Sequence, residues 1–137
     1  MRRALGWVGL VVVSTALLIR PGFAFHAGIG AGALPVVPAE MAQRLLDAGE
    51  SLSFIDLRPA EEFKTGHLPG ARSIPFWEVL KRYAEIPQTG RVILYCACSL
   101  NDVQPAYQFL WDHGYRNLAF LGEGFSGWVK RGYRVDR

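Results

Sequence analysis

The chain is poor in cysteine. Its 137 residues include only two, Cys96 and Cys98, with a single residue between them. Two thiols are too few for a structural zinc site, and no Cys-x-x-Cys-His haem attachment sequence is present. A bond between the two would close a tiny loop and remove little chain entropy, so the pair makes a poor structural staple. The sequence therefore indicates no metal and no other cofactor, and its thiols are of interest for their chemistry.

The chain also lacks a basic surface beyond its N-terminus. It has 15 basic and 12 acidic side chains, a formal charge of +3. Arg2, Arg3 and Arg20 account for this excess, because residues 1–24 contain no acidic residue. The remainder is neutral, so the charge gives no argument for nucleic acid binding and we expect no nucleic acid partner.

The uncharged apolar run near the start, residues 4–19, is short for a membrane span, which needs roughly 20 residues. A basic start followed by an apolar run is typical of a secretory signal. Two alternatives stay open: residues 1–24 are a signal cleaved near Ala24, or residues 4–19 remain as a membrane anchor. Both predict a periplasmic or otherwise exported domain, because Arg2 and Arg3 stay inside.

The remaining pattern predicts one α/β domain. Residues 25–37 are uncharged and rich in Gly and Ala, which indicates a linker, and residues 38–137 suffice for a single domain. The run RVILYC (91–96) shows no alternation, so we expect a strand buried on both faces of a parallel sheet. Further strands are expected within 51–58, ending near Asp56, and at 72–75 and 117–121. They alternate with helices over 38–48, within 59–71, over 76–86, from about 102–105 to 113 and within 123–133.

Cys96 is the candidate nucleophile. It falls at the carboxyl end of the buried strand, where ligand sites form in open parallel sheets. The following helix would direct its N-terminal N–H groups and its dipole at the thiol, which lowers a cysteine pKa and favours the reactive thiolate. The alternative is a small hydrophobic side chain that ends a buried strand. Position alone does not decide between the two.

Three segments resemble the rhodanese family: FIDLRPAEEFKTGHLPGARSIP (54–75), VILYC (92–96) and HGYRNLAFLGEGFSGWVKRGYRV (113–135). They occur in the family's order, so residues 36–135 resemble a single rhodanese domain. The resemblance implies a three-layer α/β fold with a mainly parallel five-stranded sheet and helices on both faces. It also implies transfer of sulfane sulfur as a persulfide on Cys96, from a small sulfur donor to a thiol or cyanide acceptor, without a cofactor.

The predicted active-site loop departs from the family pattern. It comprises Cys96, Ala97, Cys98, Ser99, Leu100, Asn101 and Asp102, and contains no cation. Active rhodanese loops commonly place Arg or Lys at the position of Asn101 or, in a longer loop, Asp102. Without it a dianion such as thiosulfate is disfavoured as donor, and so is a related phosphatase activity. Persulfides and polysulfides remain as donors, and Asn101 or Asp102 is expected to cap the next helix.

Several roles stay open. Cys98 either resolves a persulfide on Cys96, with release of sulfide, or is inert. Asp56 and Arg58 either border the pocket or form an ion pair with Glu61 or Glu62. Two other functions compete with sulfur transfer: a thiol–disulfide redox protein that uses both cysteines, and a silent domain that binds a membrane or envelope protein. His67 and His113 are expected in structural roles, and Trp77, Trp111 and Trp128 in core or half-buried packing.

Overall fold

The structure is a computed structural model, and it describes residues 33–137. The predicted signal or anchor over residues 1–24 lies outside the described residues, as does most of the predicted linker. Within residues 33–137, no helix is both long and apolar enough to cross a membrane.

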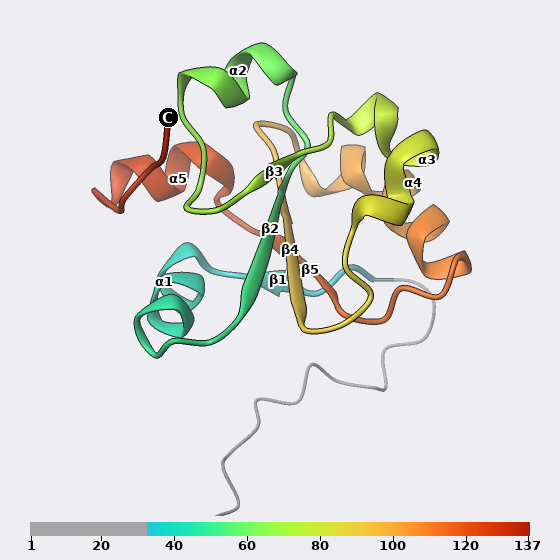
Figure 1. Cartoon of the computed structure of the whole chain (residues 1–137), viewed down its shortest axis with the longest axis horizontal. Coiled ribbons are helices and arrows are strands. Elements are labelled where there is room, and N and C mark those ends of the chain that lie inside the picture. Colours follow the sequence, from blue (N-terminus) through green and yellow to red (C-terminus); the bar gives the residue numbers. More distant parts are fainter. Residues whose placement is uncertain (1–32) are drawn as a thin grey trace, which may run out of the picture.

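Five strands form one parallel sheet in the order β1-β5-β4-β2-β3 (Figure 1). The predicted α/β class and five-stranded parallel sheet are confirmed. The central strand β4 is buried from its second residue to its last, because helices cover both faces of the sheet. The strands are β1 (Val36–Val37), β2 (Leu52–Asp56), β3 (Arg72–Ser73), β4 (Arg91–Tyr95) and β5 (Leu118–Leu121).

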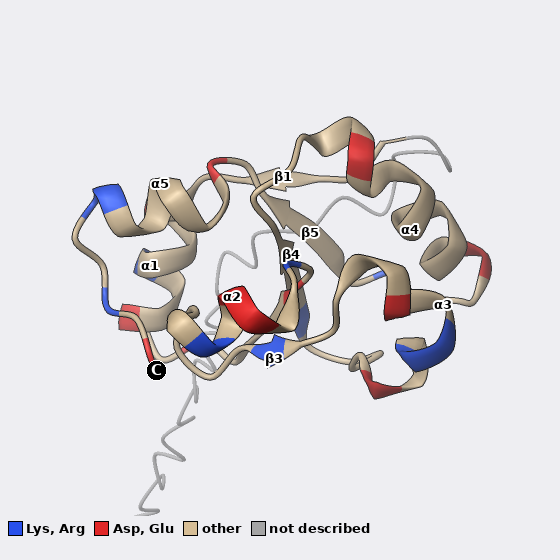
Figure 2. Ribbon diagram, turned by 90° about the horizontal axis from the view of Figure 1, so that it is seen from above, with Lys and Arg blue, Asp and Glu red and all other residues tan. Residues whose placement is uncertain are grey.

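The helices form two layers, one on each side of the sheet. In Figure 2, α1 and α5 lie on one side of the strands and α3 and α4 on the other. The buried residues of each helix pair pack with opposite faces of the same strands, which gives two separate core clusters. The helices are α1 (Ala39–Asp47), α2 (Ala60–Thr65), α3 (Val79–Arg82), α4 (Leu100–Asp112) and α5 (Gly124–Lys130).

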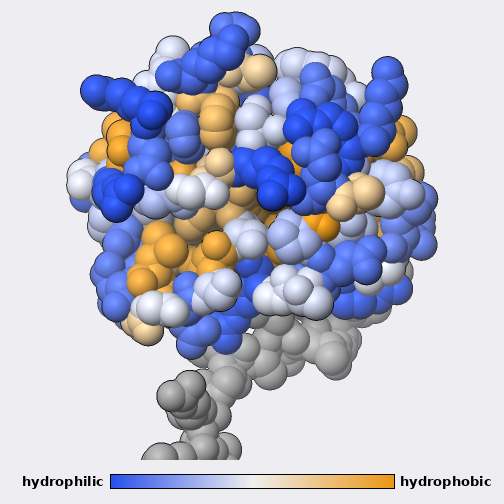
Figure 3. All heavy atoms as spheres, viewed as in Figure 1, coloured by the Kyte–Doolittle hydropathy of each residue, from blue (hydrophilic) through white to orange (hydrophobic). Residues whose placement is uncertain are grey.

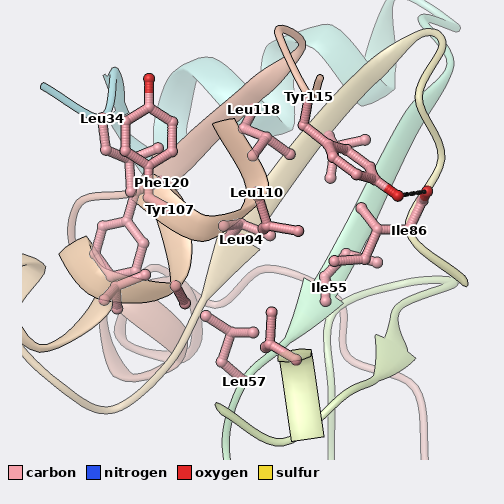
Figure 4. Packing of buried hydrophobic residues seen from close by; sticks show 14 of the residues in the cluster. Leu34, Ile55, Leu57, Ile86, Leu94, Tyr107, Leu110, Tyr115, Leu118 and Phe120 are labelled. Atoms are coloured by element: carbon pink, nitrogen blue, oxygen red, sulfur yellow. Dashed lines mark hydrogen bonds between the residues drawn. The ribbon is translucent and has the colours of Figure 1, made fainter. Parts of the chain in front are cut away.

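The cluster under α3 and α4 is dense. Figure 4 shows Leu94 of β4 and Leu110 of α4 side by side, with Phe120 and Tyr107 beyond them. Leu94 and Leu110 have no exposed surface, and burial of such a leucine contributes about 2 kcal/mol. The helix that follows the cysteines is therefore firmly attached to the strand that precedes them.

Two expected boundaries away from the cysteines were wrong. The linker predicted over residues 25–37 does not reach residue 37, because Val36–Val37 form β1 and pair with β5. The helix predicted over residues 76–86 is instead α3 between two 3₁₀ turns, at 76–78 and 83–85. Near the end of this segment, the carbonyl groups of Tyr83 and Ile86 accept hydrogen bonds from the Tyr115 hydroxyl and not from a following helical turn.

Candidate active site

Cys96 lies directly after β4 and is almost fully buried, with 3% of its surface exposed. Its backbone carbonyl accepts a hydrogen bond from the N–H of Phe125, with an N–O distance of 3.4 Å. Gly124 passes so close that a Cβ atom there would overlap this carbonyl, and its φ of +57° also favours glycine. The first turn of α5 therefore fixes the backbone at Cys96.

The loop after Cys96 is shorter than predicted. Ser99 is the N-cap of α4, so Leu100, Asn101 and Asp102 belong to the first helical turn and not to the loop. The Asp102 carboxylate accepts hydrogen bonds from the Ser99 N–H (2.9 Å) and hydroxyl (2.7 Å) in a capping box. These hydrogen bonds lower the pKa of Asp102. Asp102 thus takes part in the cap, as expected, and Ser99 is the N-cap residue.

Cys96 and Cys98 are joined by a disulfide bond, with their Cα atoms 5.3 Å apart. The Cys98 N–H also donates to the Cys96 sulfur, at 3.0 Å. Cys98 is exposed, whereas Cys96 is buried. The loop therefore brings both sulfurs into bonding contact while β4 and the α4 cap are intact. In this state Cys96 is not a free thiol, so a nucleophilic role belongs to the reduced protein.

A pocket of about 300 Å³ opens beside the disulfide. Most of its wall is apolar, and Trp77 stands at its edge with 61% of its surface exposed. The packing role expected for Trp77 was therefore wrong, because the 3₁₀ turn at 76–78 directs this side chain outward. The pocket is lined by Leu57, Arg58, Pro59, Phe76, Trp77, Cys96, Ala97, Cys98 and Asp102.

Arg58 lines this pocket with its charge already compensated. Its guanidinium donates to both carboxylate oxygens of Asp56, with a closest distance of 2.6 Å, and to the carbonyl of Gly66 at 2.7 Å. Its Cζ atom lies 3.8 Å from the centroid of the Phe125 ring. Burial alone would lower the pKa of Arg58, but hydrogen bonds to Asp56 and its charge raise that pKa overall.

Asp56 stands at the end of β2 and has no exposed surface. It is not among the residues that line the pocket. Of the two predicted acidic partners of Arg58, Glu62 lies 3.7 Å from it, whereas Glu61 pairs with Lys64. The sequence thus placed Asp56 and Arg58 on the correct sheet edge, and the structure makes them an ion pair under the pocket.

Tyr95 is a neighbour that the sequence analysis did not single out. It is the last residue of β4, is fully buried, and its hydroxyl oxygen accepts a hydrogen bond from the Leu68 N–H at 3.2 Å. Burial and the charge of Asp56 raise the pKa of Tyr95, so the phenol stays neutral. Its sequence signal was the apolar strand itself, which gave no reason to separate it from the core residues around it.

Both histidines outside residues 1–32 lie away from the pocket. His67 stacks on Phe63, with ring centroids 3.8 Å apart, and its backbone pairs with Asp136. His113 is the C-cap of α4, and its Nδ1 lies 2.7 Å from the Phe109 carbonyl oxygen. Neither histidine is among the residues that line the pocket.

The helix that follows the cysteines, α4, supplies no positively charged side chain to the site. In Figure 2 the ribbon of α4 carries no Lys or Arg, in agreement with its sequence. On the face shown in Figure 3, apolar surface appears in patches between hydrophilic side chains. Within residues 33–137, no group of three or more His, Cys, Asp or Glu side chains is placed to hold a metal ion.

Two known proteins are similar to this chain in sequence. The chain is 34% identical over 102 residues to the HTH-type transcriptional regulator Rv0324 of Mycobacterium tuberculosis, covering 74% of this chain and 44% of that protein. It is 26% identical over 104 residues to the putative sulfur carrier protein YrkF of Bacillus subtilis, covering 76% and 56%. The chain thus spans about half the length of these relatives.

Two solved structures are similar to the whole domain. The thiosulfate sulfurtransferase of Pseudomonas aeruginosa superposes with a TM-score of 0.63 at 33% identity, over 76% of this chain and 20% of that one. A rhodanese-like domain protein of Staphylococcus aureus gives 0.64 at 16% identity, over 76% and 100%. Residues 38–131 match the model of the rhodanese-like domain. With this match over most of its length, the chain belongs to the rhodanese-like domain family.

Proposed function

We propose that the domain is a sulfurtransferase that, when its cysteines are reduced, carries sulfane sulfur as a persulfide on Cys96. The observation that carries this proposal is the position of Cys96, between the carboxyl end of β4 and the N-terminus of α4, on the wall of a pocket. Cys98 donates its N–H to the Cys96 sulfur, so the loop already presents a donor to a charge at that atom.

The transfer takes two steps. The Cys96 thiolate attacks the outer sulfur of a donor, the bond within the donor breaks, and the donor leaves as its own anion. An acceptor thiolate or cyanide then attacks the outer sulfur of the Cys96 persulfide and releases the thiolate. Both anionic forms of Cys96 lie at the N-terminus of a 13-residue helix, where the helix dipole favours negative charge.

The pocket favours organic persulfides and polysulfides over thiosulfate. The charge of Arg58 is taken up by Asp56, and Asp102 adds a negative charge at the wall. A thiosulfate dianion would meet no uncompensated cation among the lining residues, whereas an apolar persulfide chain would meet Leu57, Phe76 and Trp77. The relationship to a putative sulfur carrier supports a sulfur-carrying role in general.

The test is intact-mass spectrometry of the full chain. The protein is reduced with a dithiol, freed of the dithiol under nitrogen, and incubated with polysulfide or with thiosulfate. Cys98→Ser is expected to gain one sulfur atom from polysulfide, and cyanide is expected to remove it. Cys96→Ser, the matched variant, is expected to gain none. If Cys98→Ser gains no sulfur from either donor, the proposal is wrong.

The disulfide favours a second candidate, a thiol–disulfide redox protein. This function predicts a reversible loss of two hydrogens in wild type and no sulfur on Cys96 in any variant.

A silent domain that binds a membrane or envelope protein is the other alternative. It predicts that wild type and Cys96→Ser gain no sulfur and bind the partner equally well. Export stays a prediction from residues 1–24, and the same spectra show whether these residues are still attached.

A further inference from the structure

The Cys96–Cys98 disulfide is not needed to hold the loop. Phe125 binds the carbonyl of Cys96, and Ser99 with Asp102 caps α4, so both ends of the loop are fixed by other contacts. A bond between residues two positions apart also removes little chain entropy. A structural role therefore does not account for the disulfide bond. The reactivity of the two thiols accounts for it better.

The two cysteines differ in exposure. Cys96 is buried at the end of β4, whereas Cys98 is exposed on the same pocket wall. The Cys98 sulfur already reaches the inner sulfur position, Cys96 Sγ, in a loop whose cap and strand are intact. It is therefore placed to attack a persulfide on Cys96 from within the protein, without a rearrangement of β4 or α4.

We propose that Cys98 is a resolving cysteine that converts the sulfane sulfur carried by Cys96 into sulfide. This inference rests on the proposed persulfide function and adds an activity to it. The domain would then act as a persulfide reductase and not only as a carrier that awaits an acceptor.

Cys98 would release the outer sulfur of the persulfide as sulfide. The Cys98 thiolate attacks Sγ of the Cys96 persulfide, the bond from Sγ to the outer sulfur breaks, and that sulfur leaves with the electron pair as HS⁻ after taking the proton that Cys98 gave up. The outer sulfur is reduced by two electrons, and the two cysteine sulfurs are oxidised to the disulfide. An external dithiol then reduces the disulfide by attack at the sulfur of Cys98, the exposed residue of the pair, with the Cys96 thiolate as the leaving group.

The arrangement suits this order of events. An external thiol reaches Cys98 more readily than Cys96, because only Cys98 is exposed. The Cys96 thiolate that leaves is stabilised by the Cys98 N–H and the N-terminus of α4. Each cycle therefore restores the buried nucleophile while the exposed cysteine exchanges with the reductant.

The experiment is a single turnover of the full chain. Reduced wild type, Cys98→Ser and Cys96→Ser are mixed under nitrogen with one equivalent of cysteine persulfide and no reductant. Sulfide is measured with time, and intact mass is measured at each point. Ala48→Ser, an exposed substitution at the C-cap of α1 that keeps both thiols, is the matched control.

Wild type and Ala48→Ser are expected to release about one equivalent of sulfide above the Cys96→Ser background and to lose two hydrogens. Cys98→Ser is expected to keep one extra sulfur, and its Cys96 persulfide should last at least about tenfold longer than that of wild type. In wild type the attack by Cys98 is intramolecular and therefore has a large effective concentration. Cys98→Ala is a second variant with the same expectation. A persulfide that lasts as long in wild type as in Cys98→Ser overturns this inference and leaves the proposed function standing. Failure of both Cys98 variants to take up sulfur overturns both proposals.

Discussion

The carbonyl oxygen of Cys96 lies against the α-carbon of Gly124, at the N-terminus of α5, with no room for a side chain between them. The next residue, Phe125, donates its N–H to the same oxygen. The end of the strand that carries the candidate nucleophile is thus positioned by a helix that follows it by almost thirty residues.

Gly124→Ala is expected to destabilise the fold by at least about 2 kcal/mol, because it combines a left-handed backbone with an overlap at Cys96. It should also slow sulfur uptake by displacing Cys96. Gly132→Ala is the matched control: its φ is +73°, but nothing lies within 4 Å of the added carbon. Urea unfolding should give a loss of only about 1 kcal/mol for Gly132→Ala. Equal losses for the two variants would contradict the role assigned to the overlap.

Removal of the buried ion pair should be costly. Arg58→Met leaves the Asp56 carboxylate buried without its partner, which is expected to lower the free energy of unfolding by about 3–5 kcal/mol. Arg44→Met removes an exposed pair with Glu40 on α1 and should cost less than about 1 kcal/mol. Urea unfolding of the two variants makes the comparison. A loss under 1 kcal/mol for Arg58→Met would show that Asp56 finds other partners.

A cation at the first turn of α4 should restore the use of thiosulfate. Asn101→Arg places a guanidinium beside the pocket wall at Asp102, and one charge-assisted contact is expected to raise kcat/KM for thiosulfate about tenfold. Gln88→Arg adds the same charge in the turn before β4, at the opposite edge of the sheet, and should change nothing. An equal gain in both variants would mean that net charge, and not its position, sets the donor.

Trp77 should select the donor. Trp77→Ala removes an exposed apolar wall of the pocket, so KM for an organic persulfide with an apolar chain is expected to rise about threefold to tenfold with little change in kcat. Val129→Ala truncates another exposed apolar residue, on α5, and is the control. Steady-state kinetics with persulfides of increasing chain length test this. An unchanged KM for all chain lengths would exclude Trp77 from the donor site.

Acid should weaken the contact between α5 and α1. Hydrogen bonds from Arg131 and from the Ala39 N–H lower the pKa of Glu123 in the folded protein. The folded pKa lies below the unfolded value of about 4.3, so this stability is present above that pH and is lost as pH falls through the folded pKa. Urea midpoints measured from about pH 6 down to about pH 3 should fall less steeply in Glu123→Gln than in wild type. Identical slopes would exclude this contribution.

The sequence by itself determined the main features of the sheet and the place of the candidate nucleophile. The run VILYC (92–96) was uniformly apolar, and a strand buried on both faces has no solvent side that would impose alternation. The order of strands and helices then placed Cys96 at a carboxyl edge, because parallel strands share that edge. The absence of a loop cation was also visible in the sequence, since it depends on residue type alone.

Only the tertiary structure decided how these residues act together. The helix α4 begins at Leu100, earlier than predicted, because Ser99 and Asp102 form a capping box. The sequence did not reveal this start, because serine and aspartate occur in loops as well as in helix caps. Trp77 reads as a core residue by its type, yet a 3₁₀ turn directs it to solvent. The disulfide and the contact of Gly124 with Cys96 depend on backbone paths and on distances between atoms. Such distances follow from the packing of the whole domain, which no local pattern of residues encodes.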